Sequence, residues 1–225
     1  MNSDSEIHKP GLGIHLADLR KEYALARLNR EDLATDPLEQ FQKWFKQTLG
    51  AQLQEPSAMT LATATRDGQP SARIVLLKSF DERGFSFYTN YESQKGRELI
   101  ENPHAALVIY WTELERQVRI TGEASKLSRL ESESYFNSRP RDSRLAAWVS
   151  QQSQVVGSRK ELEERIVELN NQYPNDTIPL PPNWGGFILS PSRIEFWQGR
   201  TSRLHDRFRY TKLTEGNWLI ERLAP

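Results

Sequence analysis

The segment from residue 195 to residue 207 gathers side chains that could hold an anionic, planar ligand. Within thirteen positions it contains a tryptophan, Arg203, His205 and Arg207. Arginine stays charged at every physiological pH and presents a planar fork of donors that suits phosphates and carboxylates. Histidine is the side chain whose ordinary pKa lies nearest to neutrality. A solvated edge strand with a salt-bridged Asp206 would explain the same residues, so this segment alone leaves a ligand site and a structural role open.

Two earlier segments also carry cations that suit phosphate. A strand predicted over residues 71–77 contains Arg73 and is followed by Lys78. These cations leave from opposite faces, because successive strand residues alternate, so they either reach different phosphate groups or are merely solvated. A predicted helix begins at Ser93 and Lys95, where a hydroxyl, a lysine and free N–H groups would form a phosphate cradle. The glycine pattern of a P-loop is missing there.

Two further segments add hydrogen-bonding side chains. Gln117 lies on a predicted strand between charged residues, and its amide either pairs with the edge of a heterocycle or belongs to a half-exposed strand. Tyr135 and Arg139 are four positions apart on a predicted helix and therefore share a face. Ser143, at the start of the next helix, either adds a hydroxyl to a phosphate site or caps that helix.

These sets offer more phosphate-compatible groups than one ligand needs, although the 30 basic and 30 acidic residues cancel. Two phosphorylated ligands, one of them flat and aromatic, would explain the surplus. The zero net charge disfavours a nucleic-acid-binding protein. The chain has no cysteine, and it has no zinc-protease motif, Ser-His-Asp spacing or dinucleotide glycine fingerprint. Without its own nucleophile or metal site, the protein is expected to take its reactivity from an organic cofactor.

The hydrophobic pattern predicts a mainly β protein with peripheral helices. Asp36 as N-cap, Pro37 and Glu39 mark a helix start, and Leu49 is expected on its apolar face. Helices are predicted over 16–33, 37–49, 93–101, 128–138, 143–151 and 158–172. Strands are predicted over 58–65, 71–77, 84–89, 105–111, 116–124, 185–190, 193–198 and 205–213, with a last one ending near 223. Many strands joined by hairpin turns favour an antiparallel barrel.

The domain organisation expected from this pattern is simple. Residues 1–15 are predicted to be a mobile tail, and 16–225 a single domain. That domain would carry a helical insertion at about 125–183 and a C-terminal strand region at about 184–225. The polar start lacks a secretion signal, and no run approaches the roughly 18 apolar residues of a membrane span. A soluble, cytoplasmic protein with no membrane partner is expected.

Several long strings resemble the pyridoxamine 5′-phosphate oxidase family. They include ARIVLLK, FYTNY, NPHAAL, ERQVRITG, YFNSRP, PPNWGGF, EFWQGR and RLHDRFRY, and the similarity runs in order over nearly the whole chain. The resemblance implies an FMN-binding split antiparallel β-barrel and a homodimer with FMN at the subunit interface. It also implies oxidation of pyridoxamine 5′-phosphate and pyridoxine 5′-phosphate to pyridoxal 5′-phosphate, with dioxygen reduced to hydrogen peroxide.

The resemblance also assigns roles to residues. Those implied to bind FMN are Arg73, Ile74, Val75, Leu76, Leu77, Lys78, Tyr88, Thr89, Gln94, Lys95, Gln117, Gln152, Ser153, Trp197 and Arg207, some of them from the second subunit. Those implied to bind the substrate are Arg20, Lys21, Glu22, Tyr23, Lys78, Tyr135, Arg139, Ser143, Arg203, Leu204 and His205. Arg203 and His205 are the implied catalytic pair, as orienting and electrostatic groups, with His205 also a candidate proton acceptor. No metal is implied.

Two positions depart from the family pattern. Gln94 stands where many relatives carry an arginine, so one phosphate ion pair is expected to be weak or absent. Thr201 and Ser202 stand where relatives often have a larger acidic or amide pair, which affects the local loop. The main alternatives are a flavin or pyridoxal phosphate carrier and a flavin-dependent reductase of another small molecule. A carrier would have no need of the substrate residues.

Overall fold

The structure is a computed structural model that describes residues 22–225. The predicted tail, the first part of the predicted helix over 16–33, and the candidate residues Arg20 and Lys21 lie outside the described residues. Among the helices that are described, none is long and apolar enough to cross a membrane.

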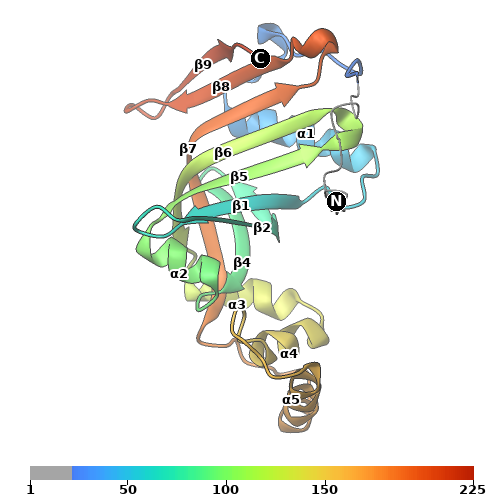
Figure 1. Cartoon of the computed structure of the whole chain (residues 1–225), viewed down its shortest axis with the longest axis vertical. Coiled ribbons are helices and arrows are strands. Elements are labelled where there is room, and N and C mark those ends of the chain that lie inside the picture. The colour runs from blue at the N-terminus through green and yellow to red at the C-terminus, as the bar shows by residue number, and fades with distance from the viewer. Residues whose placement is uncertain (1–21) are drawn as a thin grey trace, which may run out of the picture.

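A nine-stranded antiparallel sheet, strongly curled, forms the body of the molecule (Figure 1). Its strands are β1 (Ala58–Ala64), β2 (Pro70–Leu76), β3 (Ser79–Asp81), β4 (Gly84–Asn90), β5 (His104–Trp111), β6 (Arg116–Lys126), β7 (Trp184–Gln198), β8 (Asp206–Lys212) and β9 (Trp218–Leu223). The strand order is β2-β1-β5-β6-β7-β4-β3, and β8 and β9 continue from β7. The predicted strands are confirmed except that those over 185–190 and 193–198 form the single strand β7, while β3, only three residues long, was not predicted.

The long strand β7 belongs to both halves of the curled sheet. Its first part pairs with β4, its last part pairs with β8, and β6 follows it along most of its length. Two strands were predicted here, but the chain continues through a bulge opposite Gly122. A Cβ at Gly122 would lie 1.9 Å from the carbonyl oxygen of Ser190, so only glycine fits the crossing.

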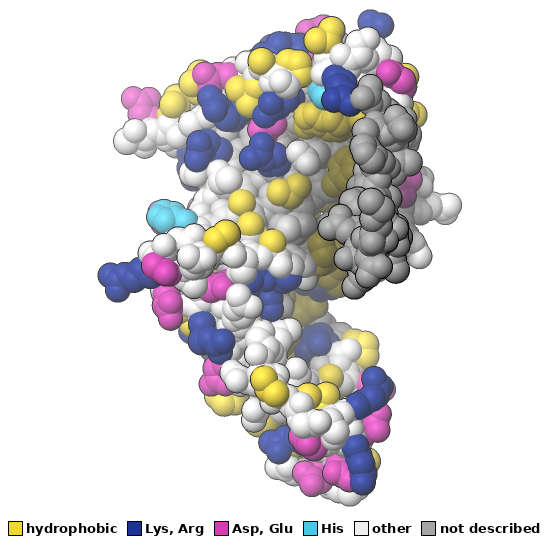
Figure 2. All heavy atoms as spheres, viewed as in Figure 1, with side chains coloured by type: hydrophobic (Ala, Val, Ile, Leu, Met, Phe, Trp, Pro, Cys, Tyr) yellow, Lys and Arg dark blue, Asp and Glu magenta, His cyan; other side chains and the backbone are white. Residues whose placement is uncertain are grey.

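The helices are α1 (Pro37–Gly50), α2 (Gln94–Glu101), α3 (Arg129–Ser138), α4 (Arg141–Val149) and α5 (Arg159–Gln172). Short 3₁₀ turns lie at Arg30–Asp32, Thr112–Leu114 and Thr201–Arg203. Helix α1 begins as predicted, because the Asp36 side chain accepts from the N–H of Leu38 at 2.6 Å and Pro37 occupies the first turn. On the face shown in Figure 2, acidic and basic side chains are mixed over the helical end of the molecule.

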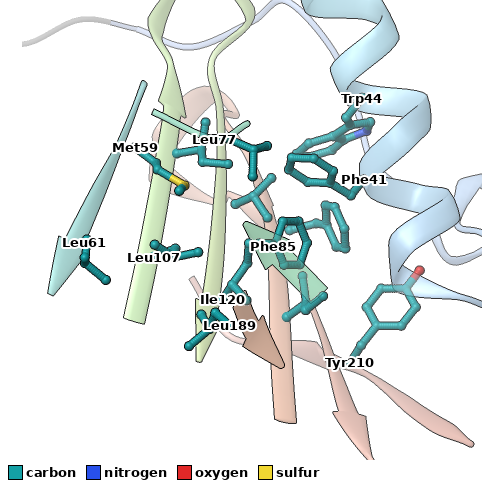
Figure 3. Packing of buried hydrophobic residues seen from close by; sticks show 14 of the residues in the cluster. Phe41, Trp44, Met59, Leu61, Leu77, Phe85, Leu107, Ile120, Leu189 and Tyr210 are labelled. Carbon is teal, nitrogen blue, oxygen red and sulfur yellow. The ribbon is translucent and has the colours of Figure 1, made fainter. Parts of the chain in front are cut away.

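The main hydrophobic core lies between α1 and the inner face of the sheet. Phe41 and Trp44 project from α1 toward Phe85 and neighbouring strand residues, and all three are at most 3% exposed (Figure 3). Each such side chain contributes on the order of 1.5–3 kcal/mol through burial. The prediction for Leu49 was wrong, since this side chain is 56% exposed at the last turn, where α1 leaves the sheet.

The predicted helix over 16–33 is wrong within its described part, because residues 22–29 are not helical. Their backbone N–H groups are bound by acidic side chains from other elements rather than by their own carbonyls. Glu115 accepts from the N–H groups of Ala24 and Leu25, both at 3.0 Å, and Asp206 accepts from that of Leu28 at 3.1 Å. Tertiary hydrogen bonds have replaced the helical ones here.

Helices α3, α4 and α5 extend from the lower end of the sheet and form a second, smaller core (Figure 1). Its buried members include Phe136, Leu145, Leu169 and Trp184, and the last of these is the first residue of β7. This core therefore joins the helical segment to the end of the sheet where β4 and β7 pair.

Candidate active site

A cavity of about 840 Å³ lies between β2, β4, α2 and the start of α4. It brings together most of the residues expected to bind FMN and the substrate phosphate. The predicted residues that line it are Arg73, Ile74, Val75, Leu76, Lys78, Tyr88, Thr89, Gln94, Lys95, Tyr135, Arg139, Ser143, Gln152 and Ser153. Leu77 does not line it, because its side chain is 6% exposed and packs in the main core. The predicted alternation holds, with Ile74, Leu76 and Lys78 exposed on the face opposite to Leu77.

One end of the cavity is built around the first turn of α2. Ser93 caps this helix by accepting from the N–H of Gly96 at 3.2 Å. The ammonium of Lys95 donates to Thr89 at 3.3 Å and to Gln152 at 2.9 Å, and Thr89 donates to Gln152 at 2.9 Å. A hydroxyl, a lysine and a helix N-terminus that converge in this way form an anion site.

Lys95 is 8% exposed, and its burial has an electrostatic consequence. Burial, followed by the nearby charge of Arg73, lowers the pKa of Lys95 to about 8, while Glu98 acts to raise it. A dianionic phosphate bound beside the ammonium would favour its charged form. This end of the cavity is therefore suited to a phosphate.

Gln152 and Ser153 reach the same end from the loop after α4. The Ser153 hydroxyl accepts from the N–H of Gln94 at 3.2 Å, and the Asn90 amide donates to the carbonyl of Ser150 at 3.3 Å. Ser153 has a φ of 72°, a left-handed conformation that is uncommon outside glycine. Both residues thus lie in the same subunit as Thr89 and Lys95.

The other end of the cavity is aromatic and holds Arg139. Tyr135 stacks on Tyr88, with ring centroids 3.9 Å apart, and the guanidinium of Arg139 lies 4.8 Å from the ring centroid of Trp184. The buried Nη1 of Arg139 has no hydrogen-bond partner among the described residues. Burial lowers the pKa of Arg139, but a guanidinium is so strongly basic that the side chain stays cationic. A buried donor left unpaired indicates that a ligand completes it.

Ser143 lies at the same end, in the first turn of α4. The alternative that it caps this helix is wrong, because the N-cap is Pro140. Ser143 lines the cavity together with Tyr135 and Arg139. Trp184, which the sequence analysis did not single out, provides the aromatic surface beneath Arg139.

The remaining predicted residues form a second group near the far end of β7. Trp197 pairs with Gln117 on β6 and with Arg207 on β8. The rings of Trp197 and His205 lie 4.7 Å apart, and Tyr23 packs edge-on against both at 5.7 Å. Arg207 donates to Glu195 and to the carbonyl of Ala224, each at 2.8 Å.

The backbone around the second group is tightly fitted. A Cβ at Gly199 would lie 2.9 Å from the Cβ and Cγ of Tyr23, so glycine permits the close approach of this ring. Tyr23 is followed by the two N–H groups that Glu115 binds, while Glu22 is exposed. The exposed Leu204 and Arg203 lie beside His205, and both Ser202 and Arg203 adopt left-handed conformations, with φ of 55° and 59°. Such strain in non-glycine residues gathers at functional sites.

His205 has a defined hydrogen-bonding role. The N–H of Arg200 donates to its Nδ1 at 3.1 Å, so Nδ1 carries a lone pair and the neutral ring carries its proton on Nε2. Burial, followed by the charges of Arg203 and Arg207, lowers the pKa of His205. The imidazole is therefore mainly neutral at pH 7, with Nε2 as its N–H donor.

The two groups of predicted residues lie far apart in one chain. Thr89 in the cavity pairs with Gly185, and Gln117 in the second group pairs with Trp197, twelve residues further along β7. At about 3.3 Å a residue this is about 40 Å of strand. Figure 1 shows the corresponding arrangement, with α3 and α4 at one end of β7 and β8 at the other. The described residues contain no cluster of three or more His, Asp or Glu side chains that could hold a metal.

Two parts of the chain match known protein families. Residues 45–173 match the pyridoxamine 5′-phosphate oxidase family, and residues 184–225 match the pyridoxine 5′-phosphate oxidase C-terminal dimerisation region.

Similar curated proteins carry one name. The pyridoxine/pyridoxamine 5′-phosphate oxidase of Trichormus variabilis is 60% identical over 210 residues, which cover 93% of this chain and 98% of that protein. The protein of the same name from Salinibacter ruber is 56% identical over 212 residues, covering 93% and 99%.

Solved structures agree on the architecture. PhzG from Burkholderia lata, solved with tetrahydrophenazine-1-carboxylic acid, has a TM-score of 0.84 and 32% identity, covering 90% of this chain and all of that one. An FMN-binding protein related to pyridoxamine 5′-phosphate oxidase, from Nostoc punctiforme, has a TM-score of 0.69 at 18% identity, covering 86% of this chain and all of that one, and supports the fold alone. The fold is a split antiparallel β-barrel with peripheral helices, and the chain belongs to the pyridoxamine 5′-phosphate oxidase family.

Proposed function

We propose that this protein oxidises pyridoxamine 5′-phosphate and pyridoxine 5′-phosphate to pyridoxal 5′-phosphate, with FMN as cofactor and dioxygen as the final electron acceptor. The alcohol reaction consumes one dioxygen and releases one hydrogen peroxide, and the amine reaction also consumes water and releases ammonia. The observation that carries the proposal is a single cavity with two separate phosphate-compatible ends. Lys95 marks one end and the unpaired donor of Arg139 marks the other.

The residues at the α2 end fit the phosphate of FMN. Lys95, Thr89 and the free N–H groups at the start of α2 supply a cation, a hydroxyl and backbone donors. Burial of the Lys95 ammonium next to Arg73 supports this assignment, because a bound anion would stabilise both charges. FMN, when bound, supplies the two-electron oxidation of the substrate C4′ carbon. The backbone of residues 73–78 and Tyr88 would lie along the flavin.

The substrate phosphate would bind at the aromatic end. Arg139 supplies a charged fork with an unpaired Nη1, Tyr135 a phenol and Ser143 a hydroxyl beside free N–H groups. Lys78 reaches the cavity from the end of β2. The substrate ring would then extend toward the flavin between the two phosphates.

The second group of residues would complete this site from another subunit. None of Trp197, Arg203 and His205 lines the cavity of its own chain, because Trp197 lies at the far end of β7 and the other two residues follow that strand. A two-fold homodimer would place the far end of one chain beside the cavity of its partner, and the C-terminal dimerisation region supports such a homodimer. Sedimentation of a folded, FMN-saturated monomer at micromolar concentration would contradict the dimer.

The proposed roles of the second group follow from its geometry. Arg203 would orient the substrate ring against the flavin. Its left-handed backbone conformation sets the direction in which its side chain leaves the chain. His205 would donate a hydrogen bond from Nε2, because Nδ1 already accepts from Arg200. This arrangement favours an orienting and electrostatic role for His205 over that of a proton acceptor.

Two other functions fit the geometry less well. A protein that only carries flavin would not need a second cationic group, Arg139 with its unpaired Nη1, at the end of the cavity opposite Lys95. The ligand solved with PhzG is a carboxylic acid without a phosphate. An enzyme for such a ligand would need only one phosphate site in this cavity.

The direct test is spectroscopic. The purified protein should be yellow, and pyridoxamine 5′-phosphate added without oxygen should bleach it. Readmitted oxygen should restore the colour with hydrogen peroxide formed in equal amount. A yellow protein that stays yellow under anaerobic substrate is a carrier, and bleaching by unphosphorylated pyridoxamine at the same rate would contradict the assigned role of Arg139.

A further inference from the structure

Glu98 is a buried carboxylate to which the family resemblance assigns no role. It lies on α2, one helical turn after Gln94, and is 5% exposed. A buried charge is costly unless it is paired and hydrogen-bonded. Both carboxylate oxygens of Glu98 are satisfied, and three of its four partners, Ser71, Arg73 and Gln94, line the cavity assigned to FMN.

Three side chains donate to one oxygen of Glu98. Oε2 accepts from the Thr63 hydroxyl at 2.5 Å, the Ser71 hydroxyl at 2.6 Å and Nη2 of Arg73 at 3.3 Å. The other oxygen, Oε1, accepts from the Gln94 amide at 2.9 Å. Burial alone would raise the pKa of Glu98, but hydrogen bonds from Ser71, Thr63 and Gln94 and the charge of Arg73 outweigh it and lower the pKa. The group is therefore an ionised acceptor at neutral pH.

Because an ionised carboxylate only accepts, Glu98 sets the direction of the surrounding hydrogen bonds. A hydroxyl has one proton to donate, and Thr63 and Ser71 each give theirs to Glu98. Their lone pairs are then free to accept from Arg73, whose Nη1 lies 2.5 Å from Thr63 and whose Nη2 lies 2.6 Å from Ser71. Nη1 also donates to the carbonyl of Leu61 at 3.2 Å. These contacts, made by Nη1 and Nη2, hold the guanidinium of Arg73 in one orientation.

The same carboxylate acts on the other groups at this end of the cavity. It accepts from the amide of Gln94, a second side chain that lines the cavity. It also opposes the effect of Arg73 on Lys95, since Glu98 acts to raise the Lys95 pKa and Arg73 to lower it. Strands β1 and β2 and the first turn of α2 are thus linked by one acidic side chain.

We propose that Glu98 is a positioning residue for the flavin phosphate, which orients Arg73 and Gln94 beside the first turn of α2. The inference rests on the proposed assignment of this cavity to FMN. Its consequence is selective: Glu98 should matter for the binding of a phosphorylated flavin and not for the binding of riboflavin, which has the same ring system without the phosphate. A merely structural role would affect both flavins alike.

The test is a titration of the apoprotein with FMN and with riboflavin, followed by quenching of flavin fluorescence. Glu98→Ala should weaken FMN binding by at least about tenfold, the loss expected for one charge-assisted hydrogen bond, and leave riboflavin binding within about twofold. Glu98→Gln, which keeps one acceptor and the volume, should show the same selectivity with a smaller loss. Glu101→Gln, an exposed carboxylate on the same helix, is the matched control and should change neither.

A double-mutant cycle shows whether Glu98 acts through Arg73. In an Arg73→Ala background, Glu98→Gln should weaken FMN binding by a smaller factor than it does with Arg73 present, because one of the two groups that it positions is gone while Gln94 remains. Tighter FMN binding by either Glu98 variant, equal weakening of both flavins, or full additivity with Arg73→Ala would overturn the inference. If Arg73→Ala and Lys95→Ala themselves leave FMN binding unchanged, the assignment of the cavity fails instead, so the two failures are distinct. Should Glu98→Ala not fold, Glu98→Gln decides the question alone.

Discussion

The backbone N–H of Arg200 donates to Nδ1 of His205 at 3.1 Å and thereby fixes the neutral imidazole as a donor at Nε2. Protonation of this ring would break that hydrogen bond, and burial together with Arg203 and Arg207 already lowers its pKa. The charged form is therefore the one that the site disfavours. A group with a lowered pKa becomes charged only as the pH falls through that value, so its effect should be confined to the acid side.

The pH profile of the reaction tests this state of His205. The ordinary pKa of histidine is 6.5, and that of His205 is lower. We therefore expect kcat/KM to be insensitive to the ionisation of His205 above pH 6.5 and to decrease at lower pH as the ring becomes charged. His205→Asn, which keeps a donor but does not titrate, should have a lower rate and should lose this component of the acid limb. A rate that rises as the pH falls through 6 would show that the charged imidazole is the active form.

Arg203 and Arg207 are expected to have separate tasks although they are four residues apart. Arg203→Ala should keep its FMN and its dimer, while anaerobic flavin reduction slows by at least about tenfold, or roughly 1.4 kcal/mol in the barrier. Arg207→Ala should instead weaken FMN retention, because its guanidinium is fixed by Glu195 and Ala224 next to Trp197. Stopped-flow reduction and the bound-flavin content of both variants give the answer. The same defect in both would mean that this segment acts as one structural unit.

Arg139→Ala should raise the KM for pyridoxamine 5′-phosphate far more than it changes the FMN content. A charge-assisted phosphate bond is worth about 1.5–3 kcal/mol, which corresponds to roughly 10- to 150-fold. Arg139→Lys keeps the charge without the fork and should recover part of the loss. Steady-state kinetics and the absorbance ratio of flavin to protein are the measurements. A colourless Arg139→Ala protein with unchanged substrate affinity would place this arginine on the flavin.

FMN affinity should depend on pH through Lys95. The pKa of Lys95 is lowered to about 8 in the protein. Its side chain is therefore positively charged below pH 8 and loses this charge as the pH rises through 8. The phosphate dianion prefers the charged form, and FMN affinity should therefore be constant near pH 7 and decline above pH 8. Lys95→Arg, which stays charged, should remove this decline, and titrations between pH 6.5 and 9.5 would reveal it. An equal decline in both proteins would assign the effect to another group.

Local signals accounted for most of the fold. The Asp36-Pro37 cap produced α1 where expected, and Asp67-Gly68 closes the hairpin between β1 and β2, with Gly68 at a φ of 90°. In the described part of the helix expected over 16–33, residues 22–29 are not helical, because Glu115 and Asp206, which are distant in sequence, accept from the N–H groups of Ala24, Leu25 and Leu28. The two strands expected within β7 are one, because a bulge opposite Gly122 interrupts the pattern without ending the strand.

The candidate site was only partly readable from the sequence. Strand alternation separated Arg73 from Lys78, and helical spacing brought Tyr135 and Arg139 to one cavity. Glu98 was missed because an acidic residue on a charged helix is typical of a solvated face, and only the tertiary structure buries it. The division of the residues between the two ends of β7 depends on the sheet topology, which spacing along the chain does not reveal.

A mixed-dimer experiment tests most directly whether two chains build one active site. Arg139→Ala removes the cavity group and Arg203→Ala removes the far group. At a substrate concentration well below the raised KM of the Arg139→Ala protein, each homodimer should therefore keep at most about a tenth of the wild-type rate. In a heterodimer of the two variants, both changes fall in one site and the other site is intact. With two-fold symmetry, a heterodimer purified through two different tags should therefore regain about half of the wild-type rate. A heterodimer as inactive as its parents would show that each site draws both groups from a single chain.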